Sequence, residues 1–342
     1  MIEQQPKRLS AGQPHAWGRS GVGLLAAWLL CFPVSLASCV INEPLPRTPL
    51  EFLTAARAAL DKDNPNRARY LLEKVDETQF RGDDVVRYQV LYGEALLAIN
   101  EPYDAFLALQ KIPTDHPTSP LRPRAEDLHF EAGRRLTASS WNFLGIASDL
   151  NDGTAVLRHF VTYWPRSRHI PEALRILGEA AYLTEDYQLA IHRFTQIVQI
   201  NPSPELTDLA ASRIAMAQFK QIKGPQYDKG QMERAREELA GYLQRARAPE
   251  RIEEARQALA TVLAWREERD FQIARYYLTI ARPAAARMHI EKLLARSETE
   301  DREEASRLLE RARRLEVEQA QPRAVDKSLE APKVDSRVEV DR

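Results

Sequence analysis

Small residues recur at a fixed spacing of twelve positions along this chain. Gly, Ala and Pro follow one another at this spacing, and the triple occurs twice. Roughly 0.1 such triples are expected by chance at these residue frequencies. A small residue is needed where two antiparallel helices cross closely, so the spacing predicts stacked helical hairpins. The two triples are Gly93, Ala105 and Pro117, and Gly178, Ala190 and Pro202.

The residues around the triples have the pattern of a tetratricopeptide repeat. In that repeat a small residue lies midway along the first helix, Ala lies where the second helix crosses it, and Pro ends the unit. Apolar residues flank the small ones at helical spacing. The chain has only 13 Gly among 342 residues, with 44% hydrophobic and 28% charged residues. A sheet-rich fold would need more turn glycines, and this length exceeds one compact core, so an extended helical array is favoured.

Further units in phase with the triples extend the array in both directions. Ala56 and Ala68 mark a first unit, and Ala274 and Ala286 mark a sixth unit. The predicted fold is therefore all-α: a tetratricopeptide-repeat superhelix of about six helical hairpins, preceded by a lipoprotein signal peptide. Each hairpin would bury its apolar face against its neighbours.

Two units are longer than the others. The spacing in the third and fifth units is twenty rather than twelve, which predicts insertions at Thr137–Asn151 and Lys223–Gly230. Both insertions would join the first helix of a unit to its second helix. A final helix with Arg and Glu interleaved is expected after the sixth unit, with intrahelical ion pairs. Apolar periodicity then ends, and we expect residues 313–342 to form a disordered charged tail.

The N-terminal region has the features of an export signal. Lys7, Arg8 and Arg19 precede an apolar run over residues 23–32, and small residues precede Cys39. This arrangement resembles the bacterial lipoprotein signal, in which the cysteine is lipidated and becomes the first mature residue. The alternative is an uncleaved transmembrane helix, since the region around the apolar run is long enough to span a bilayer.

These patterns divide the chain into five segments. A lipidated tether would connect the membrane to the folded body, because several prolines follow the cysteine. The expected segments are a signal peptide at 1–38, the tether at 39–50, N-terminal repeats at 51–202, C-terminal repeats at 203–312 and the tail at 313–342.

Composition and motifs argue against catalysis and nucleic-acid binding. The formal net charge is −1, and the seven histidines lack metal-ligand spacing. The sequence contains no glycine-rich phosphate loop, nucleophile elbow or metalloprotease motif. We therefore expect a binding protein without a metal, a cofactor or enzymatic activity.

The C-terminal half resembles one family of such repeat lipoproteins. The run AASRIAMAQFKQIKGPQYDKGQMERAREELAGYL and the later run REERDFQIARYYLTIARPAAARMHIEKLL are similar to BamD, the lipoprotein of the outer-membrane β-barrel assembly machine. The resemblance covers roughly residues 80–310. It implies that the N-terminal repeats engage unfolded outer-membrane proteins and that the C-terminal repeats dock on a BamA-like barrel protein, together with other assembly lipoproteins. It also implies a periplasm-facing, lipid-anchored location at the outer membrane.

The sequence departs from the family pattern in the number of repeats, in the docking arginine and at Pro283, where the family usually has an aromatic residue. BamD proteins usually have five repeats, whereas six are counted here, and the family's usual docking arginine is displaced or replaced. Trp265, flanked by charges at an expected helix start, is the best single contact candidate, with core packing as the alternative. The partner-docking candidates are Trp265, Arg266, Arg269, Arg275 and Tyr276.

The groove candidates lie on the first helices of the repeats, which line the concave side of such arrays. Alternating aromatic and charged side chains there suit an extended peptide, and an ordinary solvated surface is the alternative for each residue. The peptide-groove candidates are Arg87, Val90, Glu94, Phe130, Arg134, Arg175, Glu179 and Tyr182.

The same fold would also suit a different function. The alternative is a repeat-containing lipoprotein scaffold for cell-envelope, division or pilus assembly.

Overall fold

The computed structural model describes residues 45–142, 147–226, 228–296 and 301–321. The regular structure in these residues is entirely helical. Within the same residues, no helix has the length and apolar character that would allow it to cross a membrane. The predicted signal peptide, Cys39 and most of the tether lie outside the described residues.

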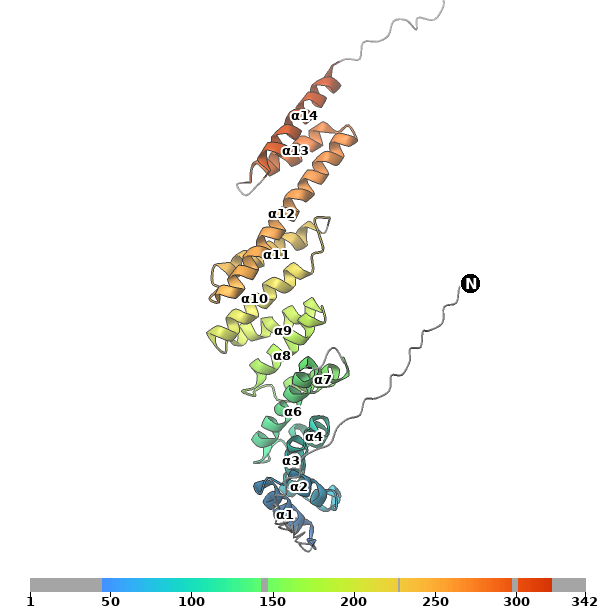
Figure 1. Cartoon of the computed structure of the whole chain (residues 1–342), viewed down its shortest axis with the longest axis vertical. Helices are drawn as coiled ribbons and strands as arrows, with labels where there is room; N and C mark the ends of the chain where they lie inside the picture. Colours follow the sequence, from blue (N-terminus) through green and yellow to red (C-terminus); the bar gives the residue numbers. More distant parts are fainter. Residues whose placement is uncertain (1–44, 143–146, 227, 297–300, 322–342) are drawn as a thin grey trace, which may run out of the picture. The chain divides into compact units, whose positions relative to one another are not determined.

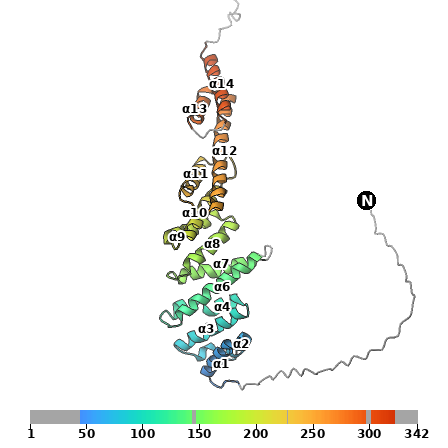
Figure 2. The same ribbon diagram turned by 60° about the vertical axis from the view of Figure 1, so that its left-hand side comes forward.

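Over the described part of the chain, the helices pair into six antiparallel hairpins, which confirms the predicted fold class. Each helix packs against its neighbours in the chain (Figure 1, Figure 2). A final helix, α14 (Arg302–Ala320), packs on the sixth hairpin, and two short elements, η1 (Glu77–Gln79) and α5 (Ile112–Asp115), lie in connections. The hairpins are α1 (Pro49–Asp61) with α2 (Pro65–Leu72), α3 (Asp83–Ala98) with α4 (Pro102–Leu109), α6 (Arg122–Asn142) with α7 (Ala147–Tyr163), α8 (Ile170–Leu183) with α9 (Tyr187–Ile200), α10 (Pro204–Lys220) with α11 (Lys229–Leu243), and α12 (Pro249–Thr279) with α13 (Pro283–Leu294).

Four hairpins turn through one left-handed residue between their helices. Asp63, Asn100, Glu185 and Ala281 have φ values of 54°, 64°, 61° and 55°. In the turn after Asn100, the next N–H reaches back to the carbonyl of Leu96, as in a helix C-terminal motif that satisfies the last carbonyls. The first, second, fourth and sixth hairpins therefore share one connection geometry, whereas the third and fifth have longer connections.

The small residues predicted to mark helix crossings lie at those crossings. A Cβ added to Gly93 would lie 2.9 Å from Leu109, and one added to Gly133 would lie 2.7 Å from Leu157. The alanines of the pattern, including Ala105, are fully buried. A larger side chain at these positions would separate the two helices of a hairpin.

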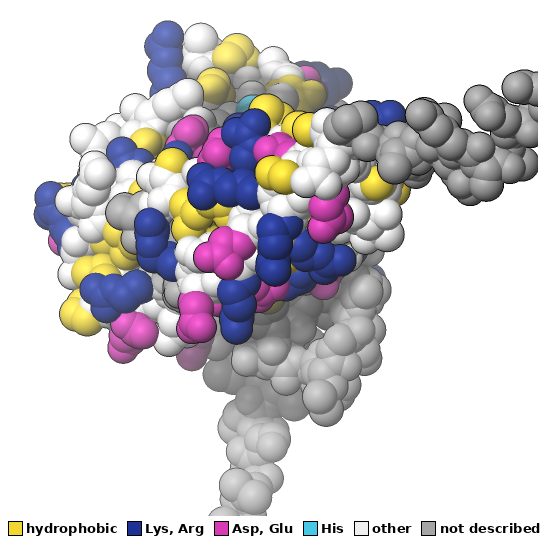
Figure 3. Space-filling view, turned by 90° about the horizontal axis from the view of Figure 1, so that it is seen from above, with side chains coloured by type: hydrophobic (Ala, Val, Ile, Leu, Met, Phe, Trp, Pro, Cys, Tyr) yellow, Lys and Arg dark blue, Asp and Glu magenta, His cyan; other side chains and the backbone are white. Residues whose placement is uncertain are grey.

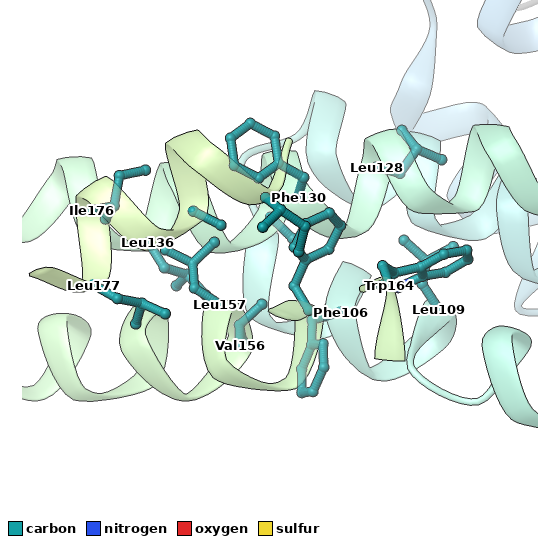
Figure 4. Packing of buried hydrophobic residues seen from close by; sticks show 14 of the residues in the cluster. Phe106, Leu109, Leu128, Phe130, Leu136, Val156, Leu157, Trp164, Ile176 and Leu177 are labelled. Atoms are coloured by element: carbon teal, nitrogen blue, oxygen red, sulfur yellow. The ribbon is translucent and has the colours of Figure 1, made fainter. Parts of the chain in front are cut away.

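Apolar packing continues from hairpin to hairpin. One cluster of buried residues extends from Val86 on α3 to Ala210 on α10, and its central part is shown in Figure 4. Smaller clusters lie between the first hairpin and α3, between α10, α11 and the first half of α12, and between the end of α12, α13 and α14. The unbroken helix α12 thus belongs to two clusters, which divide between Trp265 and Phe271.

Two expectations about connections have different outcomes. The fifth-unit insertion forms a loop between α10 and α11, as predicted. In the third unit, helix takes up most of the extra residues, since α6 continues to Asn142 and α7 begins at Ala147. Thr137 supports this extension, because its side chain is buried and its Oγ1 donates to the carbonyl of Gly133 at 3.1 Å.

The prediction of a disordered tail from residue 313 is wrong for its first eight residues. Helix α14 continues to Ala320 because it packs and pairs across its length. Leu315 packs in the C-terminal cluster, Glu316 Oε1 lies 3.1 Å from Arg287 Nε, and Gln319 donates to the carbonyl of Ala281. Residues 322–342 lie outside the described residues.

Candidate functional site

The first helices of the first three hairpins line two adjoining pockets. One of them, about 650 Å³, lies between α1, α3, α6 and the turn before α8. A second pocket shares Arg57 and Arg124 with it and extends toward Arg87 and Val90. We call these two pockets the first-helix groove. The larger pocket is lined by Arg57, Leu60, Asp61, Glu94, Leu97, Ala98, Arg124, Asp127, Leu128, Phe130, Glu131, Arg135, Arg168 and His169.

Glu94 connects three successive first helices in the groove. Its Oε2 lies 2.9 Å from Arg57 Nη1 on α1, and its Oε1 lies 2.6 Å from Arg124 Nε on α6. The Glu94 side chain is only 9% exposed, whereas the two arginines remain about half exposed. Both carboxylate oxygens therefore have partners inside the protein, while the guanidinium groups keep free donors at the groove surface.

A second set of polar contacts lies at the turn before α8. Asp127 Oδ1 is 2.9 Å from Arg168 Nη2 and 2.8 Å from His169 Nε2. Burial raises the pKa of Asp127, but the hydrogen bonds from His169 and Arg168 outweigh it, so this pKa lies below its usual value. The His169 ring also stacks on Phe130, with ring centres 4.4 Å apart. The groove wall at this point is an aromatic pair held by a charged cluster.

The structure corrects the roles expected for two groove candidates. Val90 is 2% exposed and Phe130 is 7% exposed, so both belong mainly to the core between hairpins. Each reaches the groove only as part of its wall. Helical phase places them on the correct side of their helices, but the neighbouring first helices cover that side.

The other groove candidates are charged or amphipathic residues that pair with neighbours. Arg87 lies 3.4 Å from Asp84, and Glu94 is described above. Arg134 pairs with Glu131 and Arg175 pairs with Glu172, and these four residues lie on α6 and α8, where Arg134 and Arg175 line a smaller pocket.

The line of first helices continues to α10 through one more ion pair. Glu179, whose side chain is 10% exposed, lies 2.9 Å from Arg213 Nε. The Arg213 guanidinium also lies over the ring of Tyr182, 5.0 Å from its centre. Burial raises the pKa of Tyr182 to about 12, so the phenol stays neutral. Glu179 and Tyr182 therefore position an arginine rather than present free groups to a ligand.

The groove is chemically suited to binding rather than to catalysis. The carboxylates of Glu94, Asp127 and Glu131 pair with arginines, and partly exposed guanidinium groups lie beside apolar walls. No group of three or more His, Cys, Asp or Glu in the described part of the chain is arranged to hold a metal ion. On the face seen in Figure 3, Lys and Arg are interspersed with Asp and Glu and do not form a patch of one sign.

Several groove residues are absent from the sequence predictions. Arg57, Arg124, Asp127, Arg168 and His169 all line the larger pocket. The signal that could have found them is a pair of opposite charges about one repeat apart, such as Glu94 and Arg124, which are separated by 30 positions. Residues one repeat apart lie on equivalent faces of neighbouring first helices.

The docking candidates all lie on α12. Trp265 is not at the start of this helix, where it was expected. Trp265 was expected at a helix start, but it lies within α12, which begins at Pro249. Its ring stacks on Phe219 of α10, with centres 5.7 Å apart, and it packs against the neighbouring cluster. No proline or glycine interrupts α12, so the helix continues past the charged residues that follow Trp265.

The remaining docking candidates differ in exposure. Arg266 is largely buried, with Nε 2.8 Å from Glu233 on α11, and Arg269 is half-buried. Arg275 pairs with Glu268 and Glu304. Tyr276 is 60% exposed and is the most accessible member of the set.

Comparisons with known proteins identify no family for the chain. No family model matches the sequence, and no curated protein matches it. One solved structure to which the chain is similar is the crystal structure of the P58(IPK) TPR domain, at 17% identity, with 80% of this chain and 67% of that chain covered and a TM-score of 0.22. The fold assignment rests on the packing of the hairpins described above.

Proposed function

We propose that the protein is an outer-membrane lipoprotein scaffold of the β-barrel assembly machinery. It binds a BamA-like partner through its C-terminal hairpins and nascent barrel proteins through the first-helix groove. Two features support the proposal: an array of hairpins without a metal cluster among the described residues, and the sequence resemblance of the segment from α10 to α13 to BamD. The function is binding, with no chemical step.

The observation that carries the proposal is the separation of two different surfaces. The first-helix groove lies on α1, α3 and α6, with exposed arginines over apolar walls. Tyr276 lies on the last third of α12 beside Arg275 and is exposed, whereas its neighbours Ala274 and Leu278 belong to the C-terminal apolar cluster. One surface suits an extended peptide with acidic or polar groups, and the other offers an exposed aromatic residue of the kind that anchors protein interfaces.

Membrane attachment through Cys39 is the second part of the proposal. Two or three acyl chains, at about 0.8 kcal/mol per buried CH₂, would make release negligible. Attachment also raises the effective concentration of the scaffold near membrane partners. Cys39→Ala should abolish acyl labelling and release the protein from the envelope, and equal labelling of the two forms would contradict lipidation.

Co-purification from detergent-solubilised envelopes tests the partner. The full-length protein should recover a BamA-type barrel protein, and Tyr276→Ala should reduce that recovery. Tyr103→Ala provides a matched control, since Tyr103 is 43% exposed on α4, far from α12 in sequence. Recovery of the scaffold without any barrel protein contradicts the proposal. Normal barrel levels after depletion, with shape or septation defects, would instead favour a scaffold of cell-wall or division proteins.

A further inference from the structure

A separate pocket lies outside the first-helix groove and holds two arginines that have no acidic partner among the described residues. It occupies about 190 Å³ between α7, α8 and α9. Its walls are mainly apolar, with Leu177, Ala180 and Leu189 among them. Leu177 also belongs to the apolar cluster of Figure 4, so this part of the pocket wall is continuous with the core. Arg158 of α7 and Arg193 of α9 face this space.

Neither guanidinium forms an ion pair with any residue that the structure describes. Arg158 Nε donates to the carbonyl of Thr154 at 3.3 Å, and Arg193 Nη1 donates to the amide oxygen of Gln196 at 3.3 Å. The Nε of Arg193 is buried and has no hydrogen-bond partner. Most donors of the two side chains therefore have no partner among the described residues, and the buried Nε of Arg193 costs free energy while it has none.

The two positive charges also oppose one another. Burial lowers the pKa of Arg193, and the charge of Arg158 lowers it further. An arginine with an acidic partner shows the opposite shift, since the hydrogen bond to Glu172 raises the pKa of Arg175. Arginine stays protonated in proteins, so the pocket keeps two like charges close together at neutral pH. An anion between them would relieve both the repulsion and the unused donor.

We propose that this pocket binds a carboxylate carried on a small apolar group. The two guanidinium groups hold the carboxylate oxygens, and the leucine and alanine walls hold the apolar part. The one acid that lines the pocket, Asp186, accepts the backbone N–H of Leu189 at 3.1 Å. The lining charge is thus +1 from two arginines and one aspartate, which matches a monoanion better than a doubly charged phosphate. The volume is below that of drug-sized sites and limits the apolar part to about one side chain.

Binding of N-acetyl-leucine to the full-length protein tests the proposal. Calorimetry or NMR titration should detect N-acetyl-leucine, whereas N-acetyl-leucinamide, which lacks the charge, should bind at least about 10-fold more weakly. Arg158→Gln and Arg193→Gln should each weaken binding about 10-fold or more. Arg166→Gln is the matched control, because Arg166 is exposed and does not line the pocket. Equal binding of acid and amide, or no binding by the acid, would overturn the proposal.

Peptides distinguish the possible sources of the carboxylate. A short peptide ending in leucine with a free carboxylate is compared with its amidated form and with an amidated peptide carrying one glutamate. Selective binding of the free-ended peptide assigns the site to chain termini, and selective binding of the glutamate peptide assigns it to acidic side chains. Equal binding of all three peptides contradicts recognition of a carboxylate.

Thermal unfolding separates a binding role from a structural one. If the arginines are kept for a ligand, Arg158→Gln removes a repulsion and should raise the melting temperature of the ligand-free protein. Arg193→Met, which retains the apolar stem and removes the unpartnered donor, should do the same. N-acetyl-leucine should then stabilise the wild-type protein and not these variants. Lower melting temperatures for both variants would show that the arginines support the fold and would overturn the proposal.

Discussion

Gly178 lies against the ring of Phe194 so closely that a Cβ at position 178 would be 2.9 Å from the Cζ atom. Phe194 is fully buried on α9, so its ring has little room to move. The same relationship joins Gly93 and Leu109 in the second hairpin. The contact between the two helices of a hairpin therefore depends on the absence of a side chain on the first helix.

Replacing Gly178 by Ala should destabilise the protein by about 1–2 kcal/mol, because overpacking outweighs the better helix propensity of alanine. Gly241 provides the opposite case. It lies in helix α11 and has open space where its Cβ would be, so Gly241→Ala should stabilise by about 0.5–1 kcal/mol. Urea unfolding of both variants measures these changes. A shift of the same sign for both would show that crowding at Gly178 is not the controlling factor.

The hairpins could be predicted from the sequence because close helix crossings require small residues, and these residues recur at a fixed spacing. Gly93 and Ala105 hold the positions that the spacing assigns to them. The groove could be predicted only in part. The side of a helix on which a residue lies follows from helical phase. The burial of Val90 and Phe130, however, depends on how closely the first helix of the neighbouring hairpin packs against them.

The course of α12 was not predictable from local signals alone. Charged residues follow Trp265 and suggest a helix boundary, but no residue there breaks a helix. The segment stays helical because Arg266 pairs with Glu233 on α11 and Asp270 pairs with Arg296, so both sides of the polar stretch are tied to neighbouring elements. Such contacts join distant parts of the chain, so they cannot be predicted from the helical periodicity of the sequence.

The buried His129 predicts a loss of stability in mild acid. Trp164 Nε1 donates to its Nδ1 at 3.0 Å, and burial, with a smaller contribution from His159, lowers the pKa of His129 to about 3. Below pH 6.5 the unfolded chain gains a proton that the folded state does not accept. The free energy of unfolding should therefore fall by about 1.4 kcal/mol per pH unit, or about 2 kcal/mol between pH 6.5 and 5.

Denaturant unfolding of wild type and His129→Gln at both pH values measures this effect. The variant should lose that part of the pH dependence, whatever its stability at neutral pH. His159, whose pKa is also lowered by burial, adds a change of the same sign in both proteins. The exposed His192 supplies a control that removes an imidazole without altering the core. An identical slope for wild type and His129→Gln would exclude this histidine as the cause.

Trp265 and Tyr276 should respond differently to truncation. Trp265→Ala removes the stack on Phe219 and should cost about 2–3 kcal/mol of stability, somewhat less than for a fully buried tryptophan. Tyr276→Ala, at an exposed position, should change stability by no more than about 0.5 kcal/mol. Thermal or urea unfolding checks both values. A large loss with Tyr276→Ala would mean that this ring supports the fold and is unsuitable as a probe of partner binding.

Asp208 is predicted to be the most costly acidic residue to remove in the C-terminal hairpins. Its side chain is 6% exposed, and it accepts hydrogen bonds from Arg251 at 2.7 and 3.0 Å and from the backbone N–H of Arg247 at 3.0 Å. Asp208→Ala leaves these donors without their partner, and we expect a loss of about 2–3 kcal/mol.

Glu253 provides the matched control on the same helix as Arg251. It pairs with Arg256 at 3.0 Å, but both side chains are more than half exposed, so Glu253→Ala should cost less than about 0.5 kcal/mol. Urea unfolding at neutral pH compares the two variants directly. Because Asp208 joins the start of α10 to the start of α12, its loss should also increase hydrogen exchange at the start of α12, whereas loss of Glu253 should not. Similar small losses for both variants would mean that Arg251 and the Arg247 N–H find water once Asp208 is removed.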